Sequence, residues 1–150
     1  QWDIWQAVYS PVAADGYPAP IWDKRTGVID PKVAAYWKEH YDLGHILTRD
    51  WPTLGPKLRG KLVEIVVGRA DTFFLDGAVR RFEERVRTLR NPTPQFTFDY
   101  GATDGHCWSG DHQHLNAYSR LTYHERLIPK LVEGWVKNAP KGADVTGWRR

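Results

Sequence analysis

The sequence is poor in sulfur. Its 150 residues contain one cysteine, Cys107, and no methionine. A single cysteine excludes an internal disulfide and a cysteine-rich zinc module, so neither a disulfide-stapled mini-domain nor a zinc finger fits this chain. No apolar run approaches the roughly 20 residues that a membrane-spanning helix requires, and we expect no membrane partner. These features leave the cellular compartment open.

Neither sign of charge is in large excess. Lys and Arg number 21 against 18 Asp and Glu, which gives a net charge of +3 at pH 7. Nucleic-acid-binding domains usually carry a strong basic patch, so this balance argues against a nucleic-acid partner. With 41% hydrophobic and 26% charged residues, the composition is typical of a folded globular protein. The length fits one domain or a fragment of one.

Aromatic residues, in contrast, are abundant, with 8 Trp, 7 Tyr and 5 Phe. Large aromatic side chains are unfavourable to expose in number, so they need a core, a pocket or a partner. Frequent Pro and Gly predict that residues 1–30 are irregular. Asp30 and Pro31 predict a helix that ends near Gly44, and a short helical turn should follow over 46–51 before further Pro and Gly break the chain. We therefore expect residues 1–60 to be an aromatic-rich lid or insertion that contains one main helix.

Residues 61–150 alternate between strand and helix patterns. An apolar, β-branched run at 62–67, ended by Gly68, predicts a parallel strand that is buried on both faces. A second strand is predicted over 96–100, where apolar and polar residues alternate before Gly101. Residues 61–150 are thus predicted to run strand, helix, strand, helix. With the helix that precedes them, the sequence predicts an α/β fold in which helix, strand, helix, strand and helix follow one another.

Two helices complete this pattern. Asp76 is expected to cap a helix that stops at Asn91-Pro92, because Val79, Phe82, Val86 and Leu89 fall on one helical face. The last helix is predicted over 121–137, and Pro129 inside it predicts a kink or a late start.

An acid and a histidine follow the two strands. Asp71 lies three residues beyond Gly68, and His106 lies five residues beyond Gly101. Because the carboxyl ends of parallel strands meet at the same sheet edge, we expect the two side chains to be neighbours. A carboxylate that orients an imidazole is two thirds of a hydrolytic triad, in which the other ring nitrogen takes a proton from a nucleophile.

These residues resemble the C-terminal part of the α/β-hydrolases, within their esterase and prolyl-oligopeptidase-like branches. The resemblance covers residues 60–140. Gly68-Arg69-Ala70-Asp71 is similar to the Gly-x-x-Asp turn that carries the triad acid, and Gly105-His106-Cys107-Trp108 is similar to a Gly-His-x-Trp segment that carries the triad histidine. The resemblance implies that Asp71 and His106 are catalytic in a serine hydrolase, with a carboxylic ester as the favoured substrate and no cofactor or metal.

The family's Gly-x-Ser-x-Gly nucleophile segment is missing. The only serines are Ser10, Ser109 and Ser119, and none has that context. Since the chain also begins at Gln1 without methionine, we expect a C-terminal piece of a larger hydrolase, inactive alone, whose parent takes a small ester or acyl substrate. The strand at 62–68 would then have an unpaired edge, which predicts a homo-oligomer.

Other interpretations remain open. Asp71 is also suited to a plain turn, His106 to an exposed loop, and Cys107 to a small buried hydrophobic position. A metal-binding domain would use the group His106, Asp111, His112 and His114. A non-catalytic binding module, acting on a partner surface or on sugars, would expose tryptophans as contact platforms. The candidates for that role are Trp2, Trp5, Trp22, Trp37 and Trp51.

Overall fold

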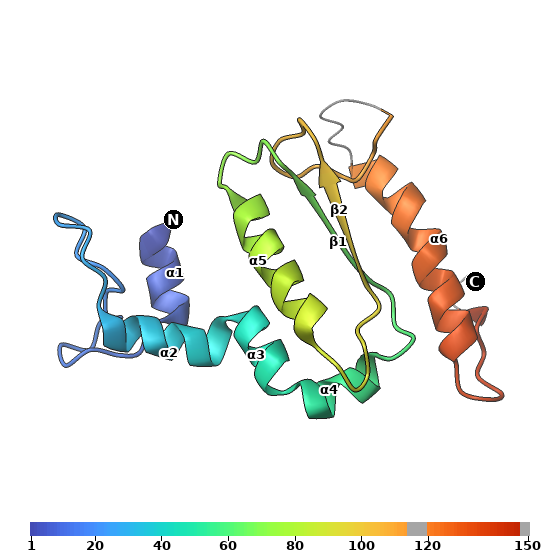
Figure 1. Cartoon of the computed structure of the whole chain (residues 1–150), viewed down its shortest axis with the longest axis horizontal. Coiled ribbons are helices and arrows are strands. Elements are labelled where there is room, and N and C mark those ends of the chain that lie inside the picture. The colour runs from blue at the N-terminus through green and yellow to red at the C-terminus, as the bar shows by residue number, and fades with distance from the viewer. Residues whose placement is uncertain (114–119, 148–150) are drawn as a thin grey trace. The chain divides into compact units, whose positions relative to one another are not determined.

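The computed structural model describes residues 1–113 and 120–147 (Figure 1). The chain divides into two compact units, Gln1–Leu54 (unit 1) and Gly55–Arg150 (unit 2). The elements in chain order are α1 (Trp2–Tyr9), α2 (Pro31–Tyr41), α3 (Leu43–Arg49), α4 (Trp51–Leu58), β1 (Val63–Gly68), α5 (Leu75–Thr88), β2 (Phe96–Gly101) and α6 (Arg120–Asn138). None of the described helices has the length and hydropathy of a membrane span.

Unit 1 begins with a helix, so the prediction of an irregular segment is wrong for residues 2–9. Pro and Gly are absent between Trp2 and Ser10, and the first proline follows α1 at Pro11. The helix is tied to the chain that follows, because the buried Gln6 accepts a hydrogen bond from the amide of Ile21 at 2.8 Å. Local composition therefore outweighed the Pro and Gly content of the whole segment.

The predicted start of α2 is confirmed. The Asp30 carboxylate accepts hydrogen bonds from the amides of Lys32 and Val33, and Pro31 occupies the first helical position. The helix ends at Tyr41, earlier than expected, because Asp42 caps the next helix by accepting from the amide of His45 at 3.0 Å. The short helical turn expected over 46–51 is present as α3, which begins at Leu43 directly after this capping residue.

α4 contradicts the predicted break after residue 51. Pro52 lies in its first turn, where the backbone amide has no helical partner to lose. Pro56 lies inside the helix, which ends two residues later at Leu58. Proline is tolerated here because one of the two is in the first turn and the other is near the end.

The two predicted strands are both present and form a parallel sheet, with Val63 opposite Phe96 and Gly68 opposite Gly101. Burial of β1 on both faces, however, is wrong. Only Val67 and Gly68 at its carboxyl end are buried, and the preceding residues are half-buried. Within the described residues β1 pairs with β2 alone, so it lacks the second neighbouring strand of an interior parallel strand.

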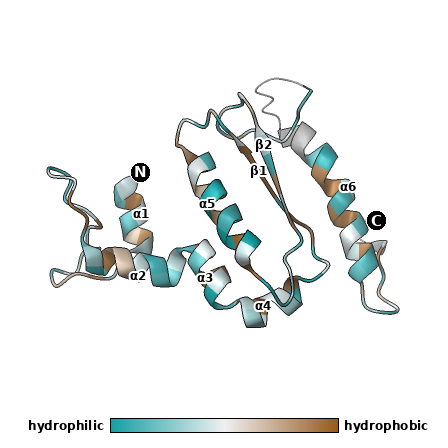
Figure 2. Ribbon diagram, in the orientation of Figure 1, coloured by the Kyte–Doolittle hydropathy of each residue, from teal (hydrophilic) through white to brown (hydrophobic). Residues whose placement is uncertain are grey.

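α5 packs against both strands. Val86 and Leu89 are buried, while Phe82 lies against the rings of Phe96 and Phe98. Figure 2 shows the largely hydrophilic outer face of this helix. Its amphipathic pattern is therefore confirmed.

The expected boundaries of α5 need correction. The residue at the N-cap position is Phe74, which makes no side-chain capping bond, and Asp76 lies within the first turn, where it pairs with Arg80 at 3.2 Å. A carboxylate in the first turn is favoured by the helix dipole without being the cap. The helix ends at Thr88, before Asn91-Pro92.

α6 is linked to β1 and to the loop after β2 by charged side chains. Lys130 pairs with Glu64 at 3.0 Å, and Arg126 donates to the carbonyl oxygens of Ser109 and Gly110, both at 2.7 Å. A late start at Pro129 is wrong, because the helix begins at Arg120 and contains this proline.

Candidate active site

The loops that follow the two strands are joined by backbone hydrogen bonds. The amide of Arg69 donates to the carbonyl of Gly101 at 2.8 Å, and the amide of Ala70 donates to the carbonyl of Asp104 at 2.9 Å. These bonds continue the link between the strands beyond their carboxyl ends. They bring the loop that carries Asp71 beside the loop that carries His106 (Figure 1).

Two glycines permit this close approach. A Cβ atom on Gly68 would lie 2.2 Å from the Asp104 carbonyl oxygen and 2.4 Å from that of Gly105. On Gly101 it would lie 2.5 Å from Asp104 Oδ2 and 2.8 Å from the Trp108 ring. These distances are far below van der Waals contact, so both positions require glycine. From the sequence alone, Gly68 and Gly101 were predicted only to mark the ends of the two strands.

Asp71 and His106 are hydrogen-bonded, so their expected proximity is confirmed. Asp71 Oδ2 lies 2.8 Å from His106 Nδ1, and Asp71 Oδ1 accepts a 2.7 Å bond from the amide of Phe73. The Asp71 side chain is 3% exposed and the His106 side chain 40% exposed. A buried carboxylate thus anchors an imidazole that reaches solvent. The catalytic role of the pair stays a prediction.

The surroundings of Asp71 favour its ionised form. Burial by itself raises the pKa of this carboxyl, but the hydrogen bonds from His106 and from the Phe73 amide outweigh it, and the pKa is lowered from 3.8. An ionised carboxylate can only accept, so Nδ1 donates to it. Nε2 is then the nitrogen that can accept a proton from another group.

Aromatic side chains support the histidine loop. The Phe73 ring packs edge-on against the His106 imidazole with 4.8 Å between ring centroids. Trp108 is buried, and its Nε1 donates to the carbonyl of Asp111 at 3.1 Å. Phe73 is not among the site residues predicted from the sequence. The signal that could have found it is the apolar run Phe73-Phe74-Leu75 directly after the candidate acid.

Two of the three serines lie in the part of the chain that the structure describes. Ser109 is buried and its carbonyl bonds to Arg126, while Ser10 in unit 1 accepts from the Trp37 indole at 3.0 Å. Ser119 lies outside the described residues. Cys107 is exposed with a φ of 62°, which corrects the expectation of a buried thiol. Its two neighbours in the chain differ in burial, since His106 is exposed and Trp108 is buried.

The candidate metal ligands His106, Asp111 and His112 do not point to a common centre, because His106 and His112 each pair with a different aspartate. His112 Nε2 bonds to both oxygens of Asp99, at 2.8 and 3.0 Å, and its ring packs on Trp108. Over residues 1–113 and 120–147, three or more His, Cys, Asp or Glu side chains do not converge on a metal site. His114 lies outside these residues. The metal interpretation thus gains no support from His106, Asp111 and His112.

The tryptophans that are candidates for contact platforms differ in exposure. Trp2 is 55% and Trp5 50% exposed, and their rings contact each other within unit 1. Trp22 packs on Trp2, and the half-buried Trp37 packs on Tyr9. Trp51 is 4% exposed, so it is wrong as a platform.

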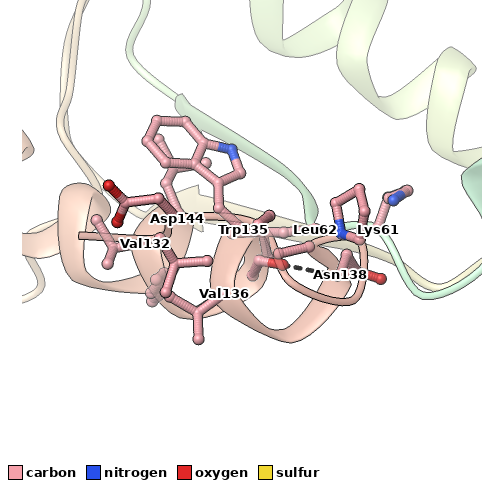
Figure 3. A pocket seen from close by; sticks show the side chains of 14 residues that line it. Lys61, Leu62, Val132, Trp135, Val136, Asn138 and Asp144 are labelled. Carbon is pink, nitrogen blue, oxygen red and sulfur yellow. Dashed lines mark hydrogen bonds between the residues drawn. The ribbon is translucent and has the colours of Figure 1, made fainter. Parts of the chain in front are cut away.

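Unit 2 also contains a cavity of about 550 Å³ (Figure 3). It opens beside Leu62, just before β1, and Trp135 and Val136 of α6 line it. Its lining contains no histidine, cysteine or serine. Its apolar side chains are accompanied by the polar or charged side chains of Lys61, Lys130, Asn138 and Asp144.

No family model, curated protein or solved structure matches the chain.

Proposed function

We propose that Asp71 and His106 are the acid and histidine of a serine-hydrolase triad, and that this chain is the C-terminal part of a carboxylic-ester hydrolase. The observation that carries the proposal is the 2.8 Å bond from His106 Nδ1 to a buried carboxylate at the carboxyl ends of two neighbouring parallel strands. The serine and the oxyanion donors would belong to the remainder of the parent enzyme.

In the proposed mechanism Asp71 keeps the imidazole in the tautomer with hydrogen on Nδ1. Nε2 of His106 takes the proton of the serine hydroxyl as its oxygen attacks the ester carbonyl. The imidazolium then gives this proton to the departing alcohol, which leaves an acyl-enzyme. A water molecule, deprotonated by the same Nε2, hydrolyses that intermediate and releases the acid. Asp71 stays ionised throughout, consistent with the lowered pKa of its carboxyl.

The tautomer of His106 provides a direct test. Long-range proton–nitrogen NMR spectra of the neutral imidazole should show hydrogen on Nδ1. Asp71→Asn replaces one acceptor oxygen by a donor amide, so the population should shift toward hydrogen on Nε2. The matched control is Asp99→Asn, which alters the other His–Asp pair and should leave His106 unchanged. A His106 tautomer indifferent to Asp71→Asn contradicts the proposal.

Activity gives a second test. The chain alone should not hydrolyse p-nitrophenyl acetate above buffer, because a histidine and an acid without nucleophile and oxyanion donors cannot form or stabilise the tetrahedral intermediate. Turnover that disappears in His106→Ala would show that the nucleophile is within this chain.

The exposed Trp2 and Trp5 favour a second candidate, a binding module in unit 1. This candidate is tested by acrylamide quenching of tryptophan fluorescence, compared between the unmodified chain and the Trp2→Phe, Trp5→Phe double variant. If these tryptophans are open platforms, the variant should lose the part of the quenching that they contribute, while the exposed Trp135 continues to be quenched. If quenching changes little, Trp2 and Trp5 are covered in solution and the platform interpretation is wrong.

A further inference from the structure

Three consecutive large apolar side chains are exposed beside the Asp71–His106 pair. Phe73, Phe74 and Leu75 are 56%, 80% and 44% exposed. Single exposed apolar residues are ordinary on protein surfaces, but a contiguous run next to a polar site is a candidate interaction surface. We call these three residues the apolar wall.

Backbone bonds fix the apolar wall to the candidate acid. The amide of Phe74 donates to the Asp71 carbonyl at 3.0 Å, and the amide of Phe73 donates to Asp71 Oδ1 at 2.7 Å. The Phe73 ring lies edge-on to His106, with 4.8 Å between centroids. The wall therefore begins in contact with the imidazole whose Nε2 would face the substrate.

Phe74 occupies a backbone position that is unfavourable for its residue type. Its φ of 56° lies in the left-handed region, where residues with a Cβ are disfavoured and where glycine or asparagine fits better. It also occupies the N-cap of α5 without a capping bond, a position that suits Ser, Thr, Asp or Asn. Residues that break several local rules at once are typical of functional sites.

We infer that the apolar wall binds a neutral aromatic group of the ester substrate. The inference rests on the proposed function, which it extends from esters in general to aryl esters. Residues 72–75 carry no charge, so the wall provides nothing to pair with an anionic or cationic group. Phe73 and Phe74 both expose a phenyl side chain, and an aromatic ring gains more from contact with another aromatic ring than from contact with a short alkyl group.

The test uses the chain as it exists, with methyl benzoate as the aryl probe and methyl acetate as the short alkyl control. Methyl benzoate should shift the NMR signals of Phe73 and His106 saturably, and methyl acetate should not at equal concentration. Phe73→Ala should weaken binding about tenfold. Phe74→Asn should weaken it similarly while it keeps the fold, because asparagine tolerates the left-handed turn and can cap α5. Trp135→Ala, which removes an equally exposed ring elsewhere in unit 2, should have no effect.

Unchanged binding in Phe73→Ala and Phe74→Asn, or equal binding of methyl acetate, overturns the inference. Phe73 signals that shift with protein concentration but not with methyl benzoate also overturn it, since a second copy then covers the wall. The His106 tautomer keeps the two proposals apart. If the His106 tautomer responds to Asp71→Asn but methyl benzoate does not bind, the triad proposal stands and the inference of an aryl substrate is wrong. Probe binding at Phe73 with an indifferent tautomer supports the wall and contradicts the triad.

Discussion

The amide of Ala70 donates a 2.9 Å hydrogen bond to the carbonyl of Asp104. This bond lies one residue before Asp71 and two before His106, so the two candidate catalytic side chains are placed by a shared backbone contact between their loops. The contact is possible because Gly68 allows the carbonyls of Asp104 and Gly105 to approach it. The geometry of the pair thus depends on a residue that takes no part in its chemistry.

Gly68→Ala should therefore disrupt the site. The new methyl group would lie 2.2 Å from the Asp104 carbonyl oxygen, and the backbone on both sides leaves it little room to move. We expect a loss of about 1–3 kcal/mol in the free energy of unfolding, the usual range for overpacking. Urea denaturation measures it. The matched control is Gly134→Ala in α6, where a Cβ meets nothing within 4 Å and where helix propensity should increase stability by about 0.5–1 kcal/mol. Equal stability of the two variants would contradict this account.

Asp71→Asn should change how stability depends on pH. Because the pKa of Asp71 is lowered from 3.8 in the folded protein, its ionised form contributes stability above that pH, and this contribution disappears as the pH falls through the folded pKa. The variant should be less stable near neutral pH by about 1.5–3 kcal/mol, the value of a hydrogen bond to a charged group. It should also lose less stability on acidification below pH 3.8 than the unmodified chain. Urea denaturation over a pH series measures both effects.

The control for that prediction is Asp99→Asn. Asp99 and His112 are 30% and 59% exposed, and exposed ion pairs contribute about 0–1 kcal/mol. If both variants lose the same stability, the burial of Asp71 has no energetic consequence and the interpretation fails.

The features that could be predicted from the sequence are those that depend on residues close together in the chain. β1, β2 and the Asp30 cap follow from short patterns in the residues themselves, and the proximity of Asp71 to His106 follows from the general rule that parallel strands end at one edge. The α/β class is confirmed, with two parallel strands and helices.

What the sequence did not predict depends on tertiary context. Phe74 adopts a left-handed conformation that its residue type disfavours, so no propensity indicates it as the start of α5. Cys107 is exposed through the same kind of turn, against the usual preference of cysteine. Half-burial of β1 could not be predicted either, because an apolar strand has the same sequence whether or not its neighbours are present.

Tyr100 should ionise only in strongly alkaline solution. Burial, together with the hydrogen bond to Glu83 at 2.7 Å and the charge of that carboxylate, raises the pKa of Tyr100 from 10.0 to about 12. Since the folded state holds this proton more tightly than the unfolded state, stability should fall as the pH rises from 10.0 to about 12. Glu83→Gln should lower the pKa of Tyr100, because it removes the negative charge. Difference ultraviolet titration against Tyr100→Phe isolates this group, and an unchanged midpoint in Glu83→Gln would assign the whole effect to burial.

The chain should self-associate through the edge of β1 that faces away from β2. In the described part of the chain β1 has β2 as its only paired strand, and a parallel pair with one open edge has backbone donors and acceptors available to another strand. The edge contains no proline and a single charged residue, Glu64, which Lys130 neutralises. Two copies related by a two-fold axis would place their β1 strands side by side and form a four-stranded sheet.

Sedimentation velocity at low micromolar concentration tests this association in a Cys107→Ser background, which excludes disulfide-linked dimers. We expect a dimer or a larger species. Leu62→Lys places a charge at the exposed residue just before β1 and should shift the population toward monomer, as lysine does at natural strand edges. Val28→Lys alters an exposed apolar residue of unit 1 and should have no such effect. A stable monomer in the unmodified chain would mean that the edge is satisfied within the chain itself. The case for a hydrolase fragment with an unpaired interior strand would then lose its structural basis.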